Sequence, residues 1–158
     1  MSRRKFIAGT AAAATSLAAG ISSAQTPRAK PPALDHDLVK EFVVAAHGNL
    51  DRTKELLAQQ PGLLNATWDW GGGDFEMAIG GAGHMGRRDI ALFLIGQGGR
   101  MDIFVAAMLG ELEVVKSLLA KYPNLLHSNG PHGIPLMAHA KAGGKEAEDV
   151  VAYLQSLA

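Results

Sequence analysis

The feature that most constrains this chain is an internal repeat with a spacing of 62 residues. Compared with itself at this offset, the sequence matches in one unbroken register, from Phe42 on Phe104 to Leu64 on Leu126. A fixed spacing of this kind indicates that one supersecondary unit has been copied along the chain. Each copy holds a short apolar segment, a glycine, and a longer segment with apolar residues at helical spacing. The repeat therefore predicts pairs of antiparallel helices joined by tight turns.

Two further copies lie between and after the first two, so the period of the repeat is about half of 62 residues. One runs from Ala82 to Ile95 and the other from Leu136 to Leu154. The segment 134–143 reads Ile-Pro-Leu-Met-Ala-His-Ala-Lys-Ala-Gly and the segment 101–110 reads Met-Asp-Ile-Phe-Val-Ala-Ala-Met-Leu-Gly. Both resemble the ankyrin family, whose repeat of about 33 residues carries Thr-Pro-Leu-His-x-Ala-Ala-x-x-Gly. The first segment keeps the proline, leucine, second alanine and glycine of that pattern, and the second keeps both alanines and the glycine.

The resemblance implies an all-α ankyrin solenoid of about four degenerate repeats, at residues 35–66, 67–99, 100–129 and 130–158. The turn glycines are unevenly spaced, at Gly48, Gly86, Gly110 and Gly143. We therefore expect a long loop at 65–74, between the first and second repeats, and almost no loop around residues 98–100.

The N-terminal segment resembles a twin-arginine export signal. Arg3 and Arg4 precede an aromatic and an aliphatic residue, and a weakly apolar run rich in Ala, Gly, Ser and Thr follows. We expect a signal at residues 1–24, cleavage between Ala24 and Gln25, and a flexible tether at 25–34. The resemblance implies a periplasmic or exported protein without stable membrane insertion after cleavage. A retained N-terminal anchor is the alternative.

Composition excludes some classes of function. The chain has 15 basic and 15 acidic residues, and removal of Arg3, Arg4 and Lys5 with the signal leaves 12 basic residues. The resulting excess of acidic residues argues against a nucleic-acid partner, because such binding depends on neutralising phosphates. The absence of cysteine excludes disulfides and thiolate metal sites. No catalytic motif is present, so we expect no enzyme activity.

Six histidines raise the question of a metal site. They are His36, His47, His84, His127, His132 and His139. None of them forms a ligand motif, since there is no His-Glu-x-x-His run and no carboxylate at ligand spacing. The sequence therefore predicts structural or surface roles for the histidines, with no metal and no cofactor. For His132 we expect hydrogen bonds to the backbone of a neighbouring repeat.

The expected function is the binding of an unidentified protein partner through the concave ankyrin groove. In the family, the residues just before the turn glycine face this groove, and the tryptophans of the Gly71–Gly73 loop either anchor a partner or fold over the core. The expected partner-binding residues are His47, Trp68, Trp70, His84, Met85, Met108, Leu109 and Lys141. The alternative is a small-ligand-binding or metal-dependent catalytic domain that uses the tryptophan loop and nearby histidines.

Overall fold

A computed structural model describes residues 30–157 of the chain. A compact unit begins at Ala33. Arg3, Arg4, Ala24 and Gln25 lie outside the described residues, so the export signal and its cleavage stay predictions. Among the helices of residues 30–157, none has the length and apolar character needed to cross a membrane.

The described residues are mostly helical, which confirms the all-α prediction at the level of fold class. A single two-stranded antiparallel sheet, β1 (Thr67–Asp69) with β2 (Phe75–Met77), is the main exception. The helices are α1 (His36–Ala46), α2 (Leu50–Gln59), α3 (Ala78–His84), α4 (Arg88–Gly96), α5 (Ile103–Met108), α6 (Leu112–Lys121), α7 (Leu136–Ala142) and α8 (Glu148–Ser156). Short 3-10 turns cover Pro61–Asn65, Pro123–His127, Pro131–Gly133 and Gly144–Ala147.

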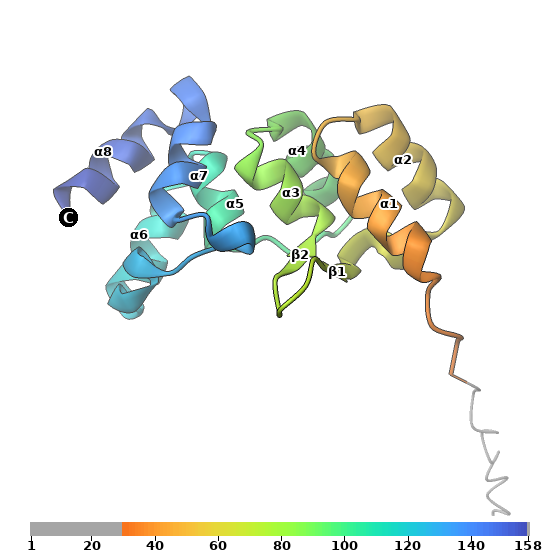
Figure 1. Cartoon of the computed structure of the whole chain (residues 1–158). Coiled ribbons are helices and arrows are strands. Elements are labelled where there is room, and N and C mark those ends of the chain that lie inside the picture. Colours follow the sequence, from red (N-terminus) through yellow and green to blue (C-terminus); the bar gives the residue numbers. More distant parts are fainter. Residues whose placement is uncertain (1–29, 158) are drawn as a thin grey trace, which may run out of the picture. The chain divides into compact units, whose positions relative to one another are not determined.

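The eight helices form four successive pairs within this unit. Each odd-numbered helix packs against the helix that follows it, and the odd-numbered helices α1, α3, α5 and α7 also contact one another in that order (Figure 1). Each pair is therefore one copy of the unit predicted from the repeat. The pairs are held together chiefly by the row of first helices.

Two of the turn glycines end their helices in the same way. Gly86 and Gly110 adopt positive φ angles of 65° and 74°, a conformation in which a Cβ atom would be strained. In each turn, the following residue donates a backbone hydrogen bond to an alanine carbonyl near the helix end, at Ala82 (2.8 Å) and Ala106 (3.0 Å). The glycines are thus required by the backbone of the helix–helix turns.

The connections between pairs differ in length as expected. Residues 60–77 join α2 to α3 and contain the β1–β2 hairpin, whereas only residues 97–102 join α4 to α5. The hairpin projects from the row of helices, and the Pro131–Gly133 turn lies beside it (Figure 1). The prediction of one long and one very short connection is confirmed.

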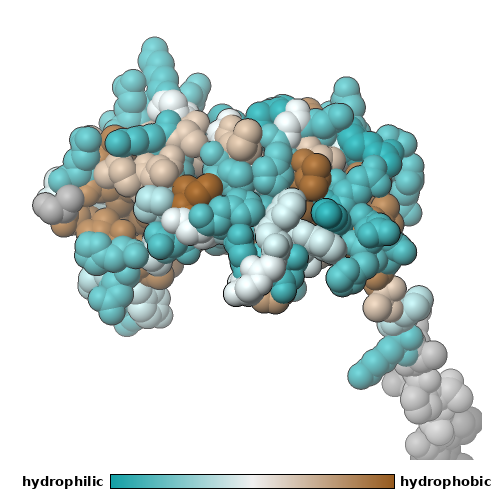
Figure 2. All heavy atoms as spheres, in the orientation of Figure 1, coloured by the Kyte–Doolittle hydropathy of each residue, from teal (hydrophilic) through white to brown (hydrophobic). Residues whose placement is uncertain are grey.

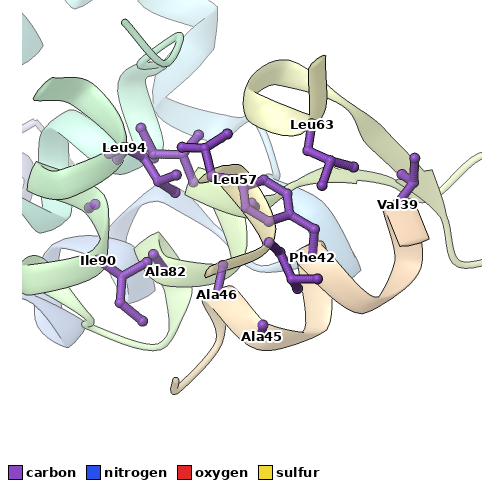
Figure 3. Packing of buried hydrophobic residues seen from close by; sticks show 14 of the residues in the cluster. Val39, Phe42, Ala45, Ala46, Leu57, Leu63, Ala82, Ile90 and Leu94 are labelled. Carbon is purple, nitrogen blue, oxygen red and sulfur yellow. The ribbon is translucent and has the colours of Figure 1, made fainter. Parts of the chain in front are cut away.

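The core consists of apolar side chains from both helices of each pair. In the N-terminal half, Phe42 of α1 and Leu57 of α2 lie together in a cluster that also includes Leu94 of α4 (Figure 3). A second cluster fills the C-terminal half, where Val115 and Leu119 of α6 are buried. The predicted apolar face of α6 is therefore correct, with Leu112 and Leu118 half-buried at its edges.

Met108 and Leu109 are not part of an exposed groove, and that expectation is wrong. Their exposed fractions are 0% and 3%, and both belong to the core. The reason is that α5 packs between α3 and α7, and the Gly144–Ala147 turn also contacts α5. Apolar residues at the end of a short, enclosed helix are then buried by both neighbours.

The difference between Leu119 and Leu118 gives a test of this packing. Leu119→Ala should lower the free energy of unfolding by about 2–4 kcal/mol, because a fully buried side chain leaves a cavity. Leu118→Ala should cost about half as much, since part of its surface stays in water. Urea denaturation followed by circular dichroism measures both. Equal losses for the two variants would contradict the orientation of α6.

Candidate metal centre

A buried carboxylate lies at the centre of the site. Glu76 is the middle residue of β2, and its side chain has no exposed surface. Because side chains alternate along a strand, Glu76 points to the face opposite its neighbours Phe75 and Met77. A buried carboxylate is costly unless hydrogen bonds or opposite charges compensate it. The surroundings of Glu76 supply hydrogen-bonding groups and three imidazoles, which carry a positive charge when protonated.

Two ring nitrogens are within hydrogen-bond distance of this carboxylate. The Nε2 atom of His84, the last residue of α3, lies 2.9 Å from Glu76 Oε1. The indole Nε1 of Trp70, in the hairpin turn, donates to Oε2 at 2.9 Å. Each carboxylate oxygen therefore has one close polar partner.

Two further histidines, which are far apart in the sequence, complete the cluster. His47 Nε2, at the end of α1, and His132 Nε2, in the Pro131–Gly133 turn, each lie 3.4 Å from Glu76 Oε2. Their other ring nitrogens are held in place, since His47 Nδ1 lies 2.9 Å from the Val43 carbonyl oxygen and His132 Nδ1 lies 2.7 Å from Asp74 Oδ2. In both rings Nδ1 is oriented by an acceptor, and Nε2 faces the carboxylate.

The four side chains of His47, Glu76, His84 and His132 form a potential metal-binding group. Each offers one ligand atom, and these atoms all lie within 4.8 Å of one another. In a tetrahedral zinc site with bonds of about 2.0–2.1 Å, neighbouring ligand atoms are about 3.3 Å apart. An ion bound here would draw these ligand atoms toward a shared centre.

Glycines in α3 create the space for this cluster. A Cβ atom on Gly81 would lie 2.7 Å from His47 Cε1 and 2.8 Å from His47 Nδ1, closer than such atoms approach. One residue earlier, a Cβ on Gly80 would lie 3.6 Å from both Glu76 Cγ and Pro131 Cγ, in ordinary contact. The bare helix surface at Gly81 allows the His47 ring to reach Glu76.

The backbone at His132 is unusual. Its φ of 60° makes it the one non-glycine residue with a positive φ in the described part of the chain. Asp74 supports this conformation by accepting hydrogen bonds from both the backbone N–H (2.9 Å) and the side chain of His132. Strained backbone of this kind is characteristic of binding sites. The expected partner of His132 was a backbone group, and the structure supplies a carboxylate instead.

The pKa values follow from these contacts. Burial alone would raise the pKa of the Glu76 carboxyl, but its contacts with His47, His84 and Trp70 outweigh burial and lower it to about 2. The pKa of His47 is raised, chiefly by its contact with Glu76, which burial of the ring opposes. The hydrogen bond from the His132 backbone lowers the pKa of Asp74. The site is therefore built around a carboxylate that stays ionised.

The other predicted binding residues lie outside the cluster. Trp68 is half-buried, with its ring 5.1 Å from that of His36 and 5.4 Å from Lys40 Nζ. Met85 and Lys141 are exposed. Of the two tryptophans, one is tucked against α1, and the other, Trp70, is 37% exposed while its indole N–H bonds to Glu76.

Sequence reasoning selected three members of the site but missed its centre. His47 and His84 were expected to face one groove, and Trp70 was expected on the glycine-rich loop, as a partner anchor or packed over the core. The structure brings the three side chains together around Glu76. Glu76 was overlooked because a single acidic residue in a loop normally stays in water. A signal was present, since Glu76 alternates with Phe75 and Met77, as in a short strand with one buried polar face. His132, for which a structural or surface role was expected, belongs to the same cluster as His47 and His84.

Comparison with known proteins adds no assignment. No protein-family model, no curated protein and no solved structure matches this chain.

The cluster predicts a distinctive pH dependence for the metal-free protein. The lowered pKa of Glu76 gives stability that is present above about pH 4.5 and is lost as the pH falls toward 2. The raised pKa of His47 gives stability that is present below pH 6.5 and is lost as the pH rises through its folded pKa. The contribution of the cluster should therefore be largest between about pH 4.5 and 6.5.

The measurement is the melting temperature in chelator from pH 3 to 9, for the natural protein and for Glu76→Gln. His84, His132 and Asp74 also face this carboxylate, so the variant removes one charge and leaves those groups in place. The difference in melting temperature should peak in the stated window. Parallel profiles for the two proteins would contradict the assignment of Glu76.

Proposed function

We propose that this domain binds a divalent transition-metal ion, in the first instance Zn²⁺, through His47, Glu76, His84 and His132. The observation that carries the proposal is the convergence of three imidazole Nε2 atoms on one buried carboxylate. Imidazole and carboxylate groups are common zinc ligands, and a cysteine-free chain can supply no thiolate. Metal binding belongs to the alternative function expected from the sequence.

The surroundings of the ligands support this proposal. In metal sites, the nitrogen of a histidine that does not bind the metal usually donates to a carbonyl or carboxylate, which fixes the ring orientation. His47 and His132 have such partners in Val43 O and Asp74 Oδ2. Trp70 gives Glu76 an equivalent support through its indole N–H. Hydrogen bonds of this type prepare ligands for an ion before it arrives.

The exposure of the ligands suggests how an ion would enter. The side chains of Glu76 and His84 are 0% and 9% exposed, whereas those of His47 and His132 are 23% and 32% exposed. The site is thus closed on the α3 side and open between His47 and His132. An ion approaching from solvent would meet these two imidazoles first.

The positions of the ligands in the chain imply a stabilising effect. They come from the end of α1, the hairpin, the end of α3 and the turn before α7. A single ion would link these four segments, and a ligand that binds only the folded state stabilises it by mass action.

Zn²⁺ should raise the melting temperature of untagged protein that has been freed of metal with chelator. At a free concentration of 100 times Kd, the expected stabilisation is about 2.7 kcal/mol. Calorimetric titration should give one ion per chain, and Co²⁺ should give the visible absorption of a four-coordinate site. Glu76→Gln and His84→Ala should each weaken binding by at least about 100-fold, because loss of a supporting residue alone costs 10–100-fold.

Two further variants act as matched tests. His127→Ala removes an exposed histidine outside the cluster and should leave the affinity unchanged. Gly81→Ala keeps all four ligands but displaces the His47 ring, so it should weaken binding by about tenfold or more. Equal affinities for the natural protein, Glu76→Gln and His84→Ala would refute this metal site.

We also propose that the four helix pairs are degenerate ankyrin repeats and that the face around the cluster binds a protein partner. The stacked first helices and the glycine turns support the first part. Met85, which is 54% exposed, and Trp70, which is 37% exposed, support the second, since each offers apolar surface to solvent. The face of the molecule drawn in Figure 2 is largely hydrophilic, with separate hydrophobic patches. Exposed Met and Trp are frequent at binding surfaces.

Met85→Glu should lower the yield of a crosslinked partner complex about tenfold, equivalent to about 1.4 kcal/mol. Leu92→Glu is the matched control, because Leu92 of α4 is 46% exposed and lies outside the proposed face. Crosslinking and mass spectrometry of the captured complex measure both. Equal losses for the two variants would count against the assignment of this face.

A further inference from the structure

A groove of about 480 Å³ lies between the second helices of the first two pairs, and we call it the α2–α4 groove. Its apolar walls come from α2, the Pro61–Asn65 turn and α4, and consist of Leu57, Ala58, Pro61, Leu64 and Phe93. No residue of the metal centre lines it. A volume of this size suits a small organic molecule.

A single charged side chain lines the α2–α4 groove. It belongs to Lys54, whose Nζ lies 5.7 Å from the centre of the Phe93 ring. No acidic residue lines the groove, and none of the ion pairs within residues 30–157 includes Lys54. The other polar side chain of the lining is Gln97, whose amide can donate a hydrogen bond to an anion. The groove therefore combines apolar walls with one positive charge that has no acidic partner.

The second half of the chain carries a matching groove between α6 and α8, which we call the α6–α8 groove. At the 62-residue offset, the α2 wall and the turn of the first groove correspond to Leu119, Ala120, Pro123 and Leu126 of the second. Its volume is smaller, at about 330 Å³. The repeat has thus produced two grooves with equivalent walls, which allows a comparison within one molecule.

The two grooves differ in the repeated lysine. Lys116, which corresponds to Lys54, lies 5.8 Å from the Tyr153 ring, but its Nζ pairs with Glu113 Oε1 at 3.1 Å. Lys116 does not line the α6–α8 groove. The position that corresponds to Glu113 carries the shorter side chain of Asp51. Of the two grooves, only the first presents its lysine to a ligand.

We propose that the α2–α4 groove binds a free monocarboxylate with an aliphatic chain. The one lysine matches the single charge of a carboxylate, whereas an anionic membrane surface is recognised by clusters of basic residues. The apolar walls match the chain, because burial of apolar surface drives such binding. At a helical rise of about 1.5 Å per residue, the α2 wall extends about 6 Å from Lys54 to Ala58, and the turn after α2 lengthens it.

The probe is octanoate, compared with hexanoate and with octylammonium, which has a chain of the same length and the opposite charge. In two-dimensional amide NMR spectra of metal-free protein, octanoate should shift the signals of residues 54–64 and 93–97, with a Kd in the millimolar range or below. Hexanoate should bind at least about fivefold more weakly, since each buried methylene changes the affinity about fourfold. Octylammonium should also bind this groove at least about fivefold more weakly. Equal shifts from the two octyl ions, or no shifts at about 10 mM octanoate, would overturn the proposal.

Lys54→Met removes the charge and keeps an apolar side chain beside Phe93. It should weaken octanoate binding at least about fivefold with little effect on folding, because Lys54 is exposed. Lys116→Met is the matched control, since Lys116 occupies the equivalent position and pairs with Glu113. Its loss should leave the affinity for octanoate unchanged. An unchanged affinity in Lys54→Met would overturn the proposal.

The same spectra test other occupants of the groove. Signals of residues 116–126 and 150–157, around the α6–α8 groove, should move less than those around the α2–α4 groove. Equal movement would show unspecific adsorption on apolar surface and overturn the proposal. Dilution without octanoate should leave the signals of residues 54–64 in place. Shifts on dilution would assign the groove to a second copy of the chain and would also overturn the proposal.

Glu76→Gln separates this proposal from the metal centre. The variant should bind octanoate with the affinity of the natural protein, whether or not Zn²⁺ binds to the natural protein. Loss of octanoate binding in Glu76→Gln would place the probe at the metal centre and overturn the assignment to the α2–α4 groove.

Discussion

The burial of the Glu76 carboxylate is the constraint on which the arrangement around the hairpin depends. A carboxylate without exposed surface needs several donors or an opposite charge to remain ionised. Three imidazoles and one indole meet this need, and they come from α1, α3, the hairpin turn and the Pro131–Gly133 turn. The hairpin is thereby tied to segments far from it in sequence. These contacts contribute to the position of the hairpin together with the apolar core.

Small residues in α3 make this convergence possible. The helix reads Ala-Ile-Gly-Gly-Ala-Gly-His, and three glycines in seven residues lower its intrinsic stability. Packing compensates, since Ala78 to Gly83 are all buried between neighbouring elements. The absence of a side chain at Gly81 admits the His47 ring, and at Gly83 it allows Val105 of α5 to approach. A helix that is weak by itself thus becomes the wall of the site.

Much of the fold could be predicted from the sequence, because the repeat, the turn glycines and the apolar spacing are local signals. The helix pairs, the long connection at residues 60–77 and the short one at 97–102 all follow from them. The site could be predicted only in part, since His47 and His132 are far apart in sequence and meet through packing. The prediction that Met108 and Leu109 are exposed was wrong for the same reason. Their burial depends on contacts with α3 and α7 that no local pattern contains.

The site lies where the repeat is least regular. At the 62-residue offset, His47 corresponds to Leu109, so the same turn position carries a polar ring in one half and a buried apolar residue in the other. The hairpin causes this difference. His47 faces Glu76 of the hairpin, whereas Leu109 faces the core. The inserted hairpin brings the Glu76 carboxylate next to position 47, where it makes a histidine favourable. The polar cluster around Glu76 therefore lies where the inserted hairpin interrupts the repeat, and the regular helix pairs hold the hairpin in place.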